Sequence, residues 1–291
     1  MAQKRKKSMS LGRLIVTAVI VAVLILIAAA ILVVKVWNVR YINVRVTDDL
    51  NVKYFGQLDK DGNPYRGKIQ YSNGVAAEVN LDRNEVVYSN GDVYHGKLVN
   101  LLKEGEGELC YANGDVYAGG FRADLMDGEG EYVYATGDRY SGEFSQGKKS
   151  GEGLYVFADG SSYEGAFRND RKNGAGVYHF ASGDVYEGDY RDDQKCGLGT
   201  YTWANGDVYE GEYQDDMRCG LGTYTWVNGE RYEGEFSANV MNGKGTYSWP
   251  SGRVFTGTFE NGVIVRTATE GNEGNEGNEG NEENEEENAA S

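Results

Sequence analysis

The sequence contains few of the residues that catalysis and covalent cross-linking depend on. Its 291 residues include only 2 Pro, 2 His and 3 Cys, beside 42 Gly and 22 Tyr. Three thiols make no disulfide framework, and His95 and His179 have no recurring partner and no nucleophile or metal ligand at a suitable spacing. No glycine loop has the pattern that cradles a phosphate between a strand and a helix. The sequence therefore predicts a non-enzyme without a cofactor or a bound metal.

Basic residues are also scarce. The 29 Lys and Arg face 45 Asp and Glu, which leaves a net charge of −16. An acidic surface repels phosphate backbones and anionic headgroups. We therefore expect no binding of nucleic acid and no binding of anionic lipid by the main part of the chain.

Only one long apolar run is present, the 21 charge-free residues Leu14–Val34. As a helix it would measure about 32 Å, close to the roughly 30 Å of a hydrocarbon core. A cleaved signal peptide is the alternative, but the run exceeds the usual signal core of about 7–15 residues. Residues 1–13 carry slightly more cations than the segment after the run. We therefore predict a single-pass signal-anchor, with a cytoplasmic N-terminus and the rest of the chain outside.

The most regular feature is an aromatic residue, one variable residue and Gly, repeated every 23 residues. It runs through eight copies, from Tyr94-His95-Gly96 to Phe255-Thr256-Gly257. Such a period is typical of stacked repeats rather than of a globular domain. In the clearest copy, residues 200–203 and 208–213 alternate with the period of strands, and Asn205-Gly206 is a hairpin signal between them. Each repeat is therefore predicted to be one β-hairpin.

Side-chain parity selects the turn of this hairpin. A two-residue Asn-Gly loop would place Tyr201 on the face of Glu210. An odd loop with a left-handed Gly206 keeps Tyr201 with Tyr209 and places the repeated glycines on the same face, where bare backbone lets aromatic rings lie flat. We therefore predict the odd loop, with one aromatic face and one hydrated face.

Units such as Gly151-Glu152-Gly153-Leu154-Tyr155 through Ser162-Tyr163-Glu164-Gly165-Ala166-Phe167 resemble the MORN repeat (membrane occupation and recognition nexus). The resemblance covers residues 82–262 well. It implies an all-β fold, an elongated and twisted antiparallel sheet of tandem 23-residue hairpins, here preceded by one transmembrane helix. For function it implies scaffolding, self-association and attachment of proteins to membrane sites. In this chain we assign the membrane contact to residues 14–34 and not to the repeats.

The composition divides the chain into five parts. After Thr269 there are nine Glu, no cation and no aromatic residue, so this end is predicted to be disordered. The parts are a basic head at 1–13, a transmembrane helix at 14–34, a transition segment with degenerate repeats at 35–81, the MORN array at 82–262 and an acidic tail at 263–291.

The aromatic face is the candidate binding surface, because a single-layer sheet leaves part of it uncovered. We expect a membrane-anchored scaffold that binds a protein partner or a second copy of itself. A cell-envelope glycan-binding module is the alternative, although the excess of 22 Tyr over 4 Trp disfavours a sugar platform. The candidate residues are Tyr155, Phe157, Tyr178, Phe180, Tyr201, Trp203, Tyr209, Tyr224, Trp226, Tyr232, Tyr247 and Trp249.

Overall fold

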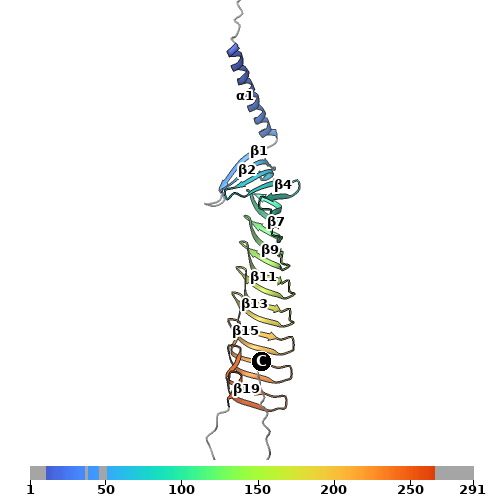
Figure 1. Cartoon of the computed structure of the whole chain (residues 1–291), viewed down its shortest axis with the longest axis vertical. Coiled ribbons are helices and arrows are strands. Elements are labelled where there is room, and N and C mark those ends of the chain that lie inside the picture. The colour runs from blue at the N-terminus through green and yellow to red at the C-terminus, as the bar shows by residue number, and fades with distance from the viewer. Residues whose placement is uncertain (1–10, 37–38, 46–50, 266–291) are drawn as a thin grey trace, which may run out of the picture. The chain divides into compact units, whose positions relative to one another are not determined.

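The computed structural model describes residues 11–36, 39–45 and 51–265 (Figure 1). The chain divides into two compact units, residues 1–126 and 127–291. Within the described residues there are 21 strands, and every pairing with a defined register is antiparallel, as the all-β prediction requires. Most of the predicted head and of the predicted tail lies outside the described residues.

The helix of the first unit, α1, spans Leu11–Val36 and so begins and ends slightly outside the predicted limits. Its large apolar side chains are exposed, from 42% at Val34 to 69% at Leu26. Within the described residues, however, no helix combines the length and the apolar character that crossing a membrane requires. The helix expected at 14–34 is therefore present, but its prediction as a transmembrane span has no support.

The first unit continues with strands whose side chains alternate between buried and exposed. In β2 the buried side chains include Val52 and Tyr54, and Tyr54 lies opposite the buried Ile69 of β3. The predicted transition segment thus forms regular strands. The strands are β1 (Val39–Arg45), β2 (Asn51–Leu58), β3 (Pro64–Tyr71), β4 (Ala76–Asn80), β5 (Glu85–Tyr88), β6 (Val93–Val99), β7 (Leu102–Cys110) and β8 (Val116–Arg122).

The second unit is a stack of hairpins in which each strand pairs with the strand before it and the strand after it. Strand β9 (Leu125–Val133) begins just before this unit, and β21 occupies the first residues of the predicted tail. The other strands are β10 (Arg139–Ser145), β11 (Lys148–Val156), β12 (Ser162–Arg168), β13 (Arg171–His179), β14 (Val185–Arg191), β15 (Gln194–Thr202), β16 (Val208–Gln214), β17 (Met217–Thr225), β18 (Arg231–Ser237), β19 (Val240–Ser248), β20 (Val254–Glu260) and β21 (Val263–Val265).

The hairpin loop of each repeat is odd, as parity predicted. The Trp203 N–H donates to the Asp207 carbonyl at 2.9 Å, which leaves the three residues 204–206 in the loop. Gly206 has a φ of 96°, in the left-handed region. Tyr201 consequently lies directly opposite Tyr209, on the same face of the sheet.

A second kind of turn joins one repeat to the next. Between β12 and β13 the two loop residues, Asn169 and Asp170, both have positive φ, at 51° and 70°. This is the backbone of a type I′ hairpin, which Asn and Asp tolerate better than most residues. Asp192 and Asp193 repeat it one unit later, at 48° and 74°. This turn was not predicted from the sequence.

The core of the second unit is a row of tyrosines that lie over paired glycines. Gly188 and Gly199 are opposite each other on neighbouring strands, and a methyl group added at either would collide with the Tyr186 ring. The predicted packing of rings on bare backbone is therefore confirmed. We call these residues the deep row, and none has any exposed area: Tyr140, Tyr163, Tyr186, Tyr209 and Tyr232.

Candidate interaction surface

The aromatic face of the second unit has two layers at different depths. In the deep row each hydroxyl donates to the carbonyl three residues later, as Tyr209 does to Glu212 at 3.0 Å. Edge-on rings flank the row, with Tyr213 at 5.3 Å and Phe236 at 5.0 Å from Tyr209. Both flanking rings are also buried. The deep row and its flanking rings are thus internal packing with no surface to offer a ligand.

The outer layer is a continuous chain of rings, which we call the aromatic ladder. Neighbouring rings are tilted by 38–49° with centroids 4.4–5.8 Å apart, for example 4.5 Å from Tyr201 to Trp203 and 5.0 Å from Trp203 to Tyr224. All members are partly exposed except Tyr247, which is buried. The ladder consists of Tyr155, Phe157, Tyr178, Phe180, Tyr201, Trp203, Tyr224, Trp226, Tyr247 and Trp249.

Carboxylates of the loops hold the ladder tyrosines in place. Asp207 accepts from the Tyr224 hydroxyl at 3.0 Å through Oδ2 and from the Val227 N–H at 2.8 Å through Oδ1. Asp184 contacts Tyr201 in the same way one repeat earlier. The phenol oxygens therefore already have partners, and their burial raises the pKa of Tyr224 to about 12. What the ladder offers a ligand is mainly ring carbon.

A column of cations runs along the ladder. The Lys172 Nζ lies 4.8 Å from the centroids of both Tyr178 and Tyr190, and the Lys195 Nζ lies 4.9 Å from that of Tyr201. Ammonium groups at this range are attracted by the negative face of an aromatic ring. The cation column consists of Lys149, Lys172, Lys195 and Arg218, all of them half-buried.

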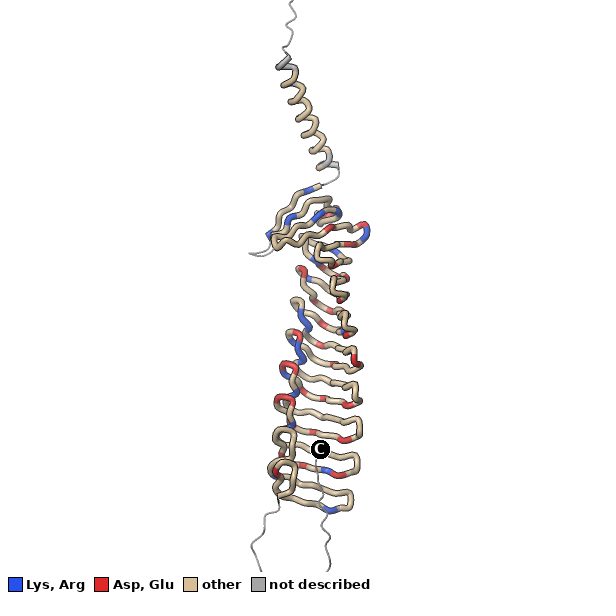
Figure 2. Tube along the Cα trace, in the orientation of Figure 1, with Lys and Arg blue, Asp and Glu red and all other residues tan. Residues whose placement is uncertain are grey.

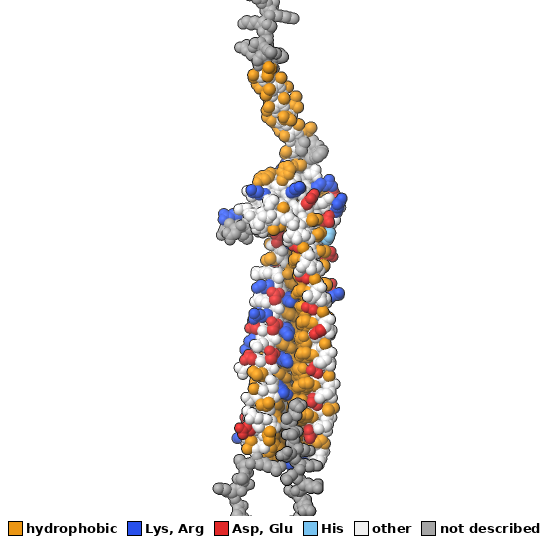
Figure 3. Space-filling model, viewed as in Figure 1, with side chains coloured by type: hydrophobic (Ala, Val, Ile, Leu, Met, Phe, Trp, Pro, Cys, Tyr) orange, Lys and Arg blue, Asp and Glu red, His pale blue; other side chains and the backbone are white. Residues whose placement is uncertain are grey.

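The lysines of the column are held partly away from water. Burial lowers the pKa of Lys149, Lys172 and Lys195, and nearby aspartates oppose this effect only in part. Figure 2 shows Lys and Arg gathered toward one edge of the second unit, and Figure 3 shows hydrophobic side chains forming a strip beside them. The surface therefore combines apolar contact area with a row of positive charge in an acidic protein.

The structure divides the predicted binding residues between the two layers. Ten of the twelve form the aromatic ladder, whereas Tyr209 and Tyr232 belong to the deep row and have no exposed area. We therefore leave these two out of the candidate surface. The cation column was not predicted from the sequence, although its members recur every 23 residues.

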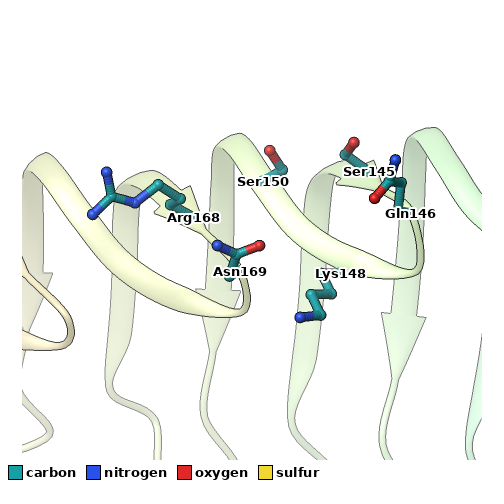
Figure 4. A pocket seen from close by; sticks show the side chains of 6 residues that line it. All are labelled: Ser145, Gln146, Lys148, Ser150, Arg168 and Asn169. Atoms are coloured by element: carbon teal, nitrogen blue, oxygen red, sulfur yellow. The ribbon is translucent and has the colours of Figure 1, made fainter.

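The described residues also form a small surface hollow, which is a weaker candidate for a binding site than the aromatic ladder. Figure 4 shows a small hollow lined by polar side chains, Ser145, Gln146, Lys148, Ser150, Arg168 and Asn169. It lies at the type I′ turns, and its lining includes no carboxylate, histidine or cysteine. Among the described residues there is no group of three or more His, Cys, Asp or Glu placed to hold a metal ion.

The repeat pattern can be compared with known families. A family model described as MORN repeat matches seven consecutive segments, residues 94–116, 117–139, 140–162, 163–185, 186–208, 209–231 and 232–252. These segments cover more than half of the chain. The chain belongs to the MORN-repeat family. Each MORN segment begins at a deep-row tyrosine or its equivalent, and each of the five segments between residues 140 and 252 supplies two rings of the ladder.

Solved structures give weaker likenesses. The TCP domain of SAS-4 (dCPAP) of Drosophila melanogaster, in complex with a proline-rich motif of Ana2 (dSTIL), is 17% identical, with a TM-score of 0.32 over 67% of this chain and 91% of that one. The TCP10 domain of Danio rerio CPAP, in complex with a STIL peptide, is 14% identical, with a TM-score of 0.24 over 70% and 98%. A streptogramin B lyase is 12% identical, with a TM-score of 0.16 over 77% and 89%. At such TM-scores these likenesses carry no argument for this chain. No curated protein sequence matches the chain.

Proposed function

We propose that this MORN-repeat protein is a binding scaffold rather than an enzyme, and that its second unit holds a protein partner along the aromatic ladder. The observation that carries the proposal is the partial exposure of a continuous row of rings with cations beside it. Aromatic residues and Arg are enriched at protein interfaces, where large rigid rings give contact area at little entropic cost. The partner would present apolar side chains to the rings and carboxylates to the column. A second copy of the chain is the alternative partner.

The three ladder tryptophans allow a test that spares the fold. Trp203, Trp226 and Trp249 hold equivalent places in consecutive repeats, and Phe157 and Phe180 hold that place in earlier ones. The triple change to Tyr should therefore leave the thermal midpoint nearly unmoved. It should weaken association, because Trp contributes more than most residues at interface hot spots.

The matched control is the double variant Leu198→Ala, Leu221→Ala. Both leucines are exposed, at 69% and 65%, and lie on the opposite face. Proteins captured from native extract by the wild-type chain and by the control, but not by the triple variant, are the expected result. Sedimentation of the purified chain tests self-association in the same variants, and purified envelope polysaccharide tests the glycan alternative. Unchanged binding by a stably folded triple variant would remove the ladder from the proposal.

We also propose, from the sequence, that the scaffold is attached to a membrane. The run at 14–34 is free of charge, and the apolar side chains described in α1 are exposed. Covering them would remove apolar surface from water, which is energetically favourable. We propose that a bilayer covers them, with residues 1–13 cytoplasmic and the repeats outside. The chain should then resist alkaline carbonate extraction, and protease added to intact cells should remove a C-terminal tag. Release by carbonate would contradict the anchor, and a protected tag would contradict the orientation.

A further inference from the structure

The strand position held by the column cations recurs beyond Arg218 up to the last described strand, where it is occupied by uncharged residues. The members of the column follow one another by 23 residues, and two more steps lead to Met241 and Ile264. Lys172 is paired with Phe167 across the strands, and Ile264 is paired with Phe259 in the same way. The last described residue is Val265, directly after Ile264. The described chain therefore ends one residue after a strand position that is in line with the column, two repeats beyond Arg218.

The column cations have no carboxylate bound to them within the described chain. The ion pairs found there involve other residues. Two aspartates close to the column accept hydrogen bonds from its backbone, Asp193 from the Lys172 N–H at 2.9 Å and Asp216 from the Lys195 N–H at 2.9 Å, and their charge offsets only part of the desolvation of the lysines. Burial without a bound anion costs free energy, and the lowered pKa of these lysines agrees with that. An added carboxylate would offset this cost.

The tail carries carboxylates at a regular interval. From residue 270 to residue 282 the sequence repeats the triplet Glu-Gly-Asn, so that one Glu occurs every third residue. Four more Glu follow by residue 287, and no Lys or Arg occurs after Arg266. The tail is therefore a polyanion with a period of three residues, and it follows a strand position that is in line with the cation column.

The two periods agree in length. One repeat is two strands, so successive cations are separated by about 9.6 Å, because neighbouring strands lie about 4.8 Å apart. Three residues of extended chain span roughly 9.6–10.2 Å. A tail that runs back along the column can therefore place one Glu beside each cation without losing register.

The length of extended chain between Val265 and each Glu also agrees with the distance from β21 to the corresponding cation. Arg218 lies on β17, four strands before β21, or about 19 Å away, and the five residues from Val265 to Glu270 reach about 17–18 Å. Lys149 lies on β11, ten strands or about 48 Å away, and the fourteen residues to Glu279 reach about 46–50 Å. Side-chain length covers the differences.

We propose that residues 270–282 of the chain's own tail dock along the cation column, with Glu270, Glu273, Glu276 and Glu279 beside Arg218, Lys195, Lys172 and Lys149 in that order. The docked tail would cover the border of the aromatic ladder. If the ladder binds a partner, as in the proposed function, the tail competes with it. The docking itself does not depend on that function.

Carbodiimide cross-linking tests the docking on the full chain, because it joins a Glu carboxylate to a Lys amine only where the two are in contact. Unlabelled and nitrogen-15-labelled chains are mixed in equal amounts at low concentration, and cross-linked peptides are identified by mass spectrometry. The proposal expects cross-links that join a tail peptide to Lys195, Lys172 or Lys149, in which the two peptides are either both labelled or both unlabelled and so come from the same chain. Mixed-isotope pairs would overturn it in favour of the tail of a second copy. Absence of column cross-links would overturn it altogether.

A second measurement tests the register through iodide quenching of Trp203 and Trp226, whose rings lie beside Arg218 or next to it along the ladder. One variant changes the periodic Glu270, Glu273, Glu276 and Glu279 to Gln. Its control changes the clustered Glu283, Glu285, Glu286 and Glu287 to Gln and so removes the same charge. Quenching should rise in the first variant and stay near wild type in the second. An equal rise in both would mean that only net charge matters and would overturn the register. Partner capture by the ladder variants is read separately, so either proposal can fail while the other stands.

Discussion

Gly199 lies directly beneath a fully buried ring, which makes Gly199→Ala a direct test of the repeat core. A Cβ at this position would lie 2.5 Å from the Tyr186 hydroxyl oxygen, 2.7 Å from Cε2 and 2.8 Å from Cζ. Non-bonded carbons prefer about 3.5–4.0 Å, so the ring would have to move by roughly 1 Å. It has little space to do so, because Tyr190 and Tyr213 meet it edge-on at 5.3 and 5.2 Å.

The cost of this substitution can be assembled from its parts. Overpacking of a core costs about 1–3 kcal/mol. Displacement of the ring also breaks the hydrogen bond from the Tyr186 hydroxyl to the Asp189 carbonyl, 3.3 Å long, which contributes about 0.5–1.5 kcal/mol. Ala is better than Gly in an extended strand by about 0.5–1 kcal/mol, and this gain offsets part of the loss. We expect Gly199→Ala to lower the free energy of unfolding by about 2 kcal/mol.

A double-mutant cycle isolates the collision. In a Tyr186→Ala background the ring is gone, so Gly199→Ala should become neutral or stabilise by about 0.5–1 kcal/mol. The assay is urea unfolding of the full chain followed by tryptophan fluorescence, with Leu198→Ala as the neighbouring control. Leu198 is 69% exposed on the other face, and its change should stay within about 0.5 kcal/mol. Equal destabilisation by Gly199→Ala in both backgrounds would refute the ring-on-glycine account.

Further predictions concern alkaline pH, the loop carboxylates and the repeat phase. Burial raises the pKa of the Tyr209 hydroxyl from 10.0 to about 12, so the stability that its protonated form contributes is present below pH 10 and is lost as the pH rises toward 12. Tyr209→Phe should therefore flatten the decline of the free energy of unfolding with pH, measured in a series of unfolding experiments. A decline as steep as that of the wild type would contradict this prediction. Asp207→Ala leaves the Val227 N–H and the Tyr224 hydroxyl without their acceptor and should lower the free energy of unfolding by about 1–3 kcal/mol. Glu210→Ala, on the exposed face, is the control and should change it little when both variants are measured by denaturant titration. Deletion of the 23 residues 174–196 should preserve cooperative unfolding better than deletion of half that length, because only the whole unit restores strand register; equal damage from both deletions would count against independent repeats.

The sequence alone was sufficient for the local architecture of the array. The fixed period gave the hairpins, and parity selected a three-residue loop closed by Gly206, because side chains on a strand alternate strictly between two faces. The same argument placed the repeated glycines beneath the rings. The type I′ turn was not predicted, although Asn169-Asp170 and Asp192-Asp193 are residue pairs that tolerate positive φ.

Depth within the aromatic face was decided only by the tertiary structure. Tyr209 and Tyr224 are paired across neighbouring strands and have the same parity, yet Tyr209 has no exposed area and Tyr224 is partly exposed. Parity assigns a face but not a depth. The Tyr209 ring turns onto Gly211 and Gly222 and is enclosed by edge-on rings from two strands, contacts that join residues up to 27 positions apart in the sequence.

The cation column depends on the tertiary structure for the same reason. Four basic residues at a 23-residue spacing are visible in the sequence, but so are several spaced acidic columns that simply face water. In each repeat the strand register shifts after the glycine, as between Gly165 and Phe167, and sets Lys172 opposite Phe167 on the aromatic face. Sequence periodicity therefore established which residues are equivalent, and strand register determined which of them meet.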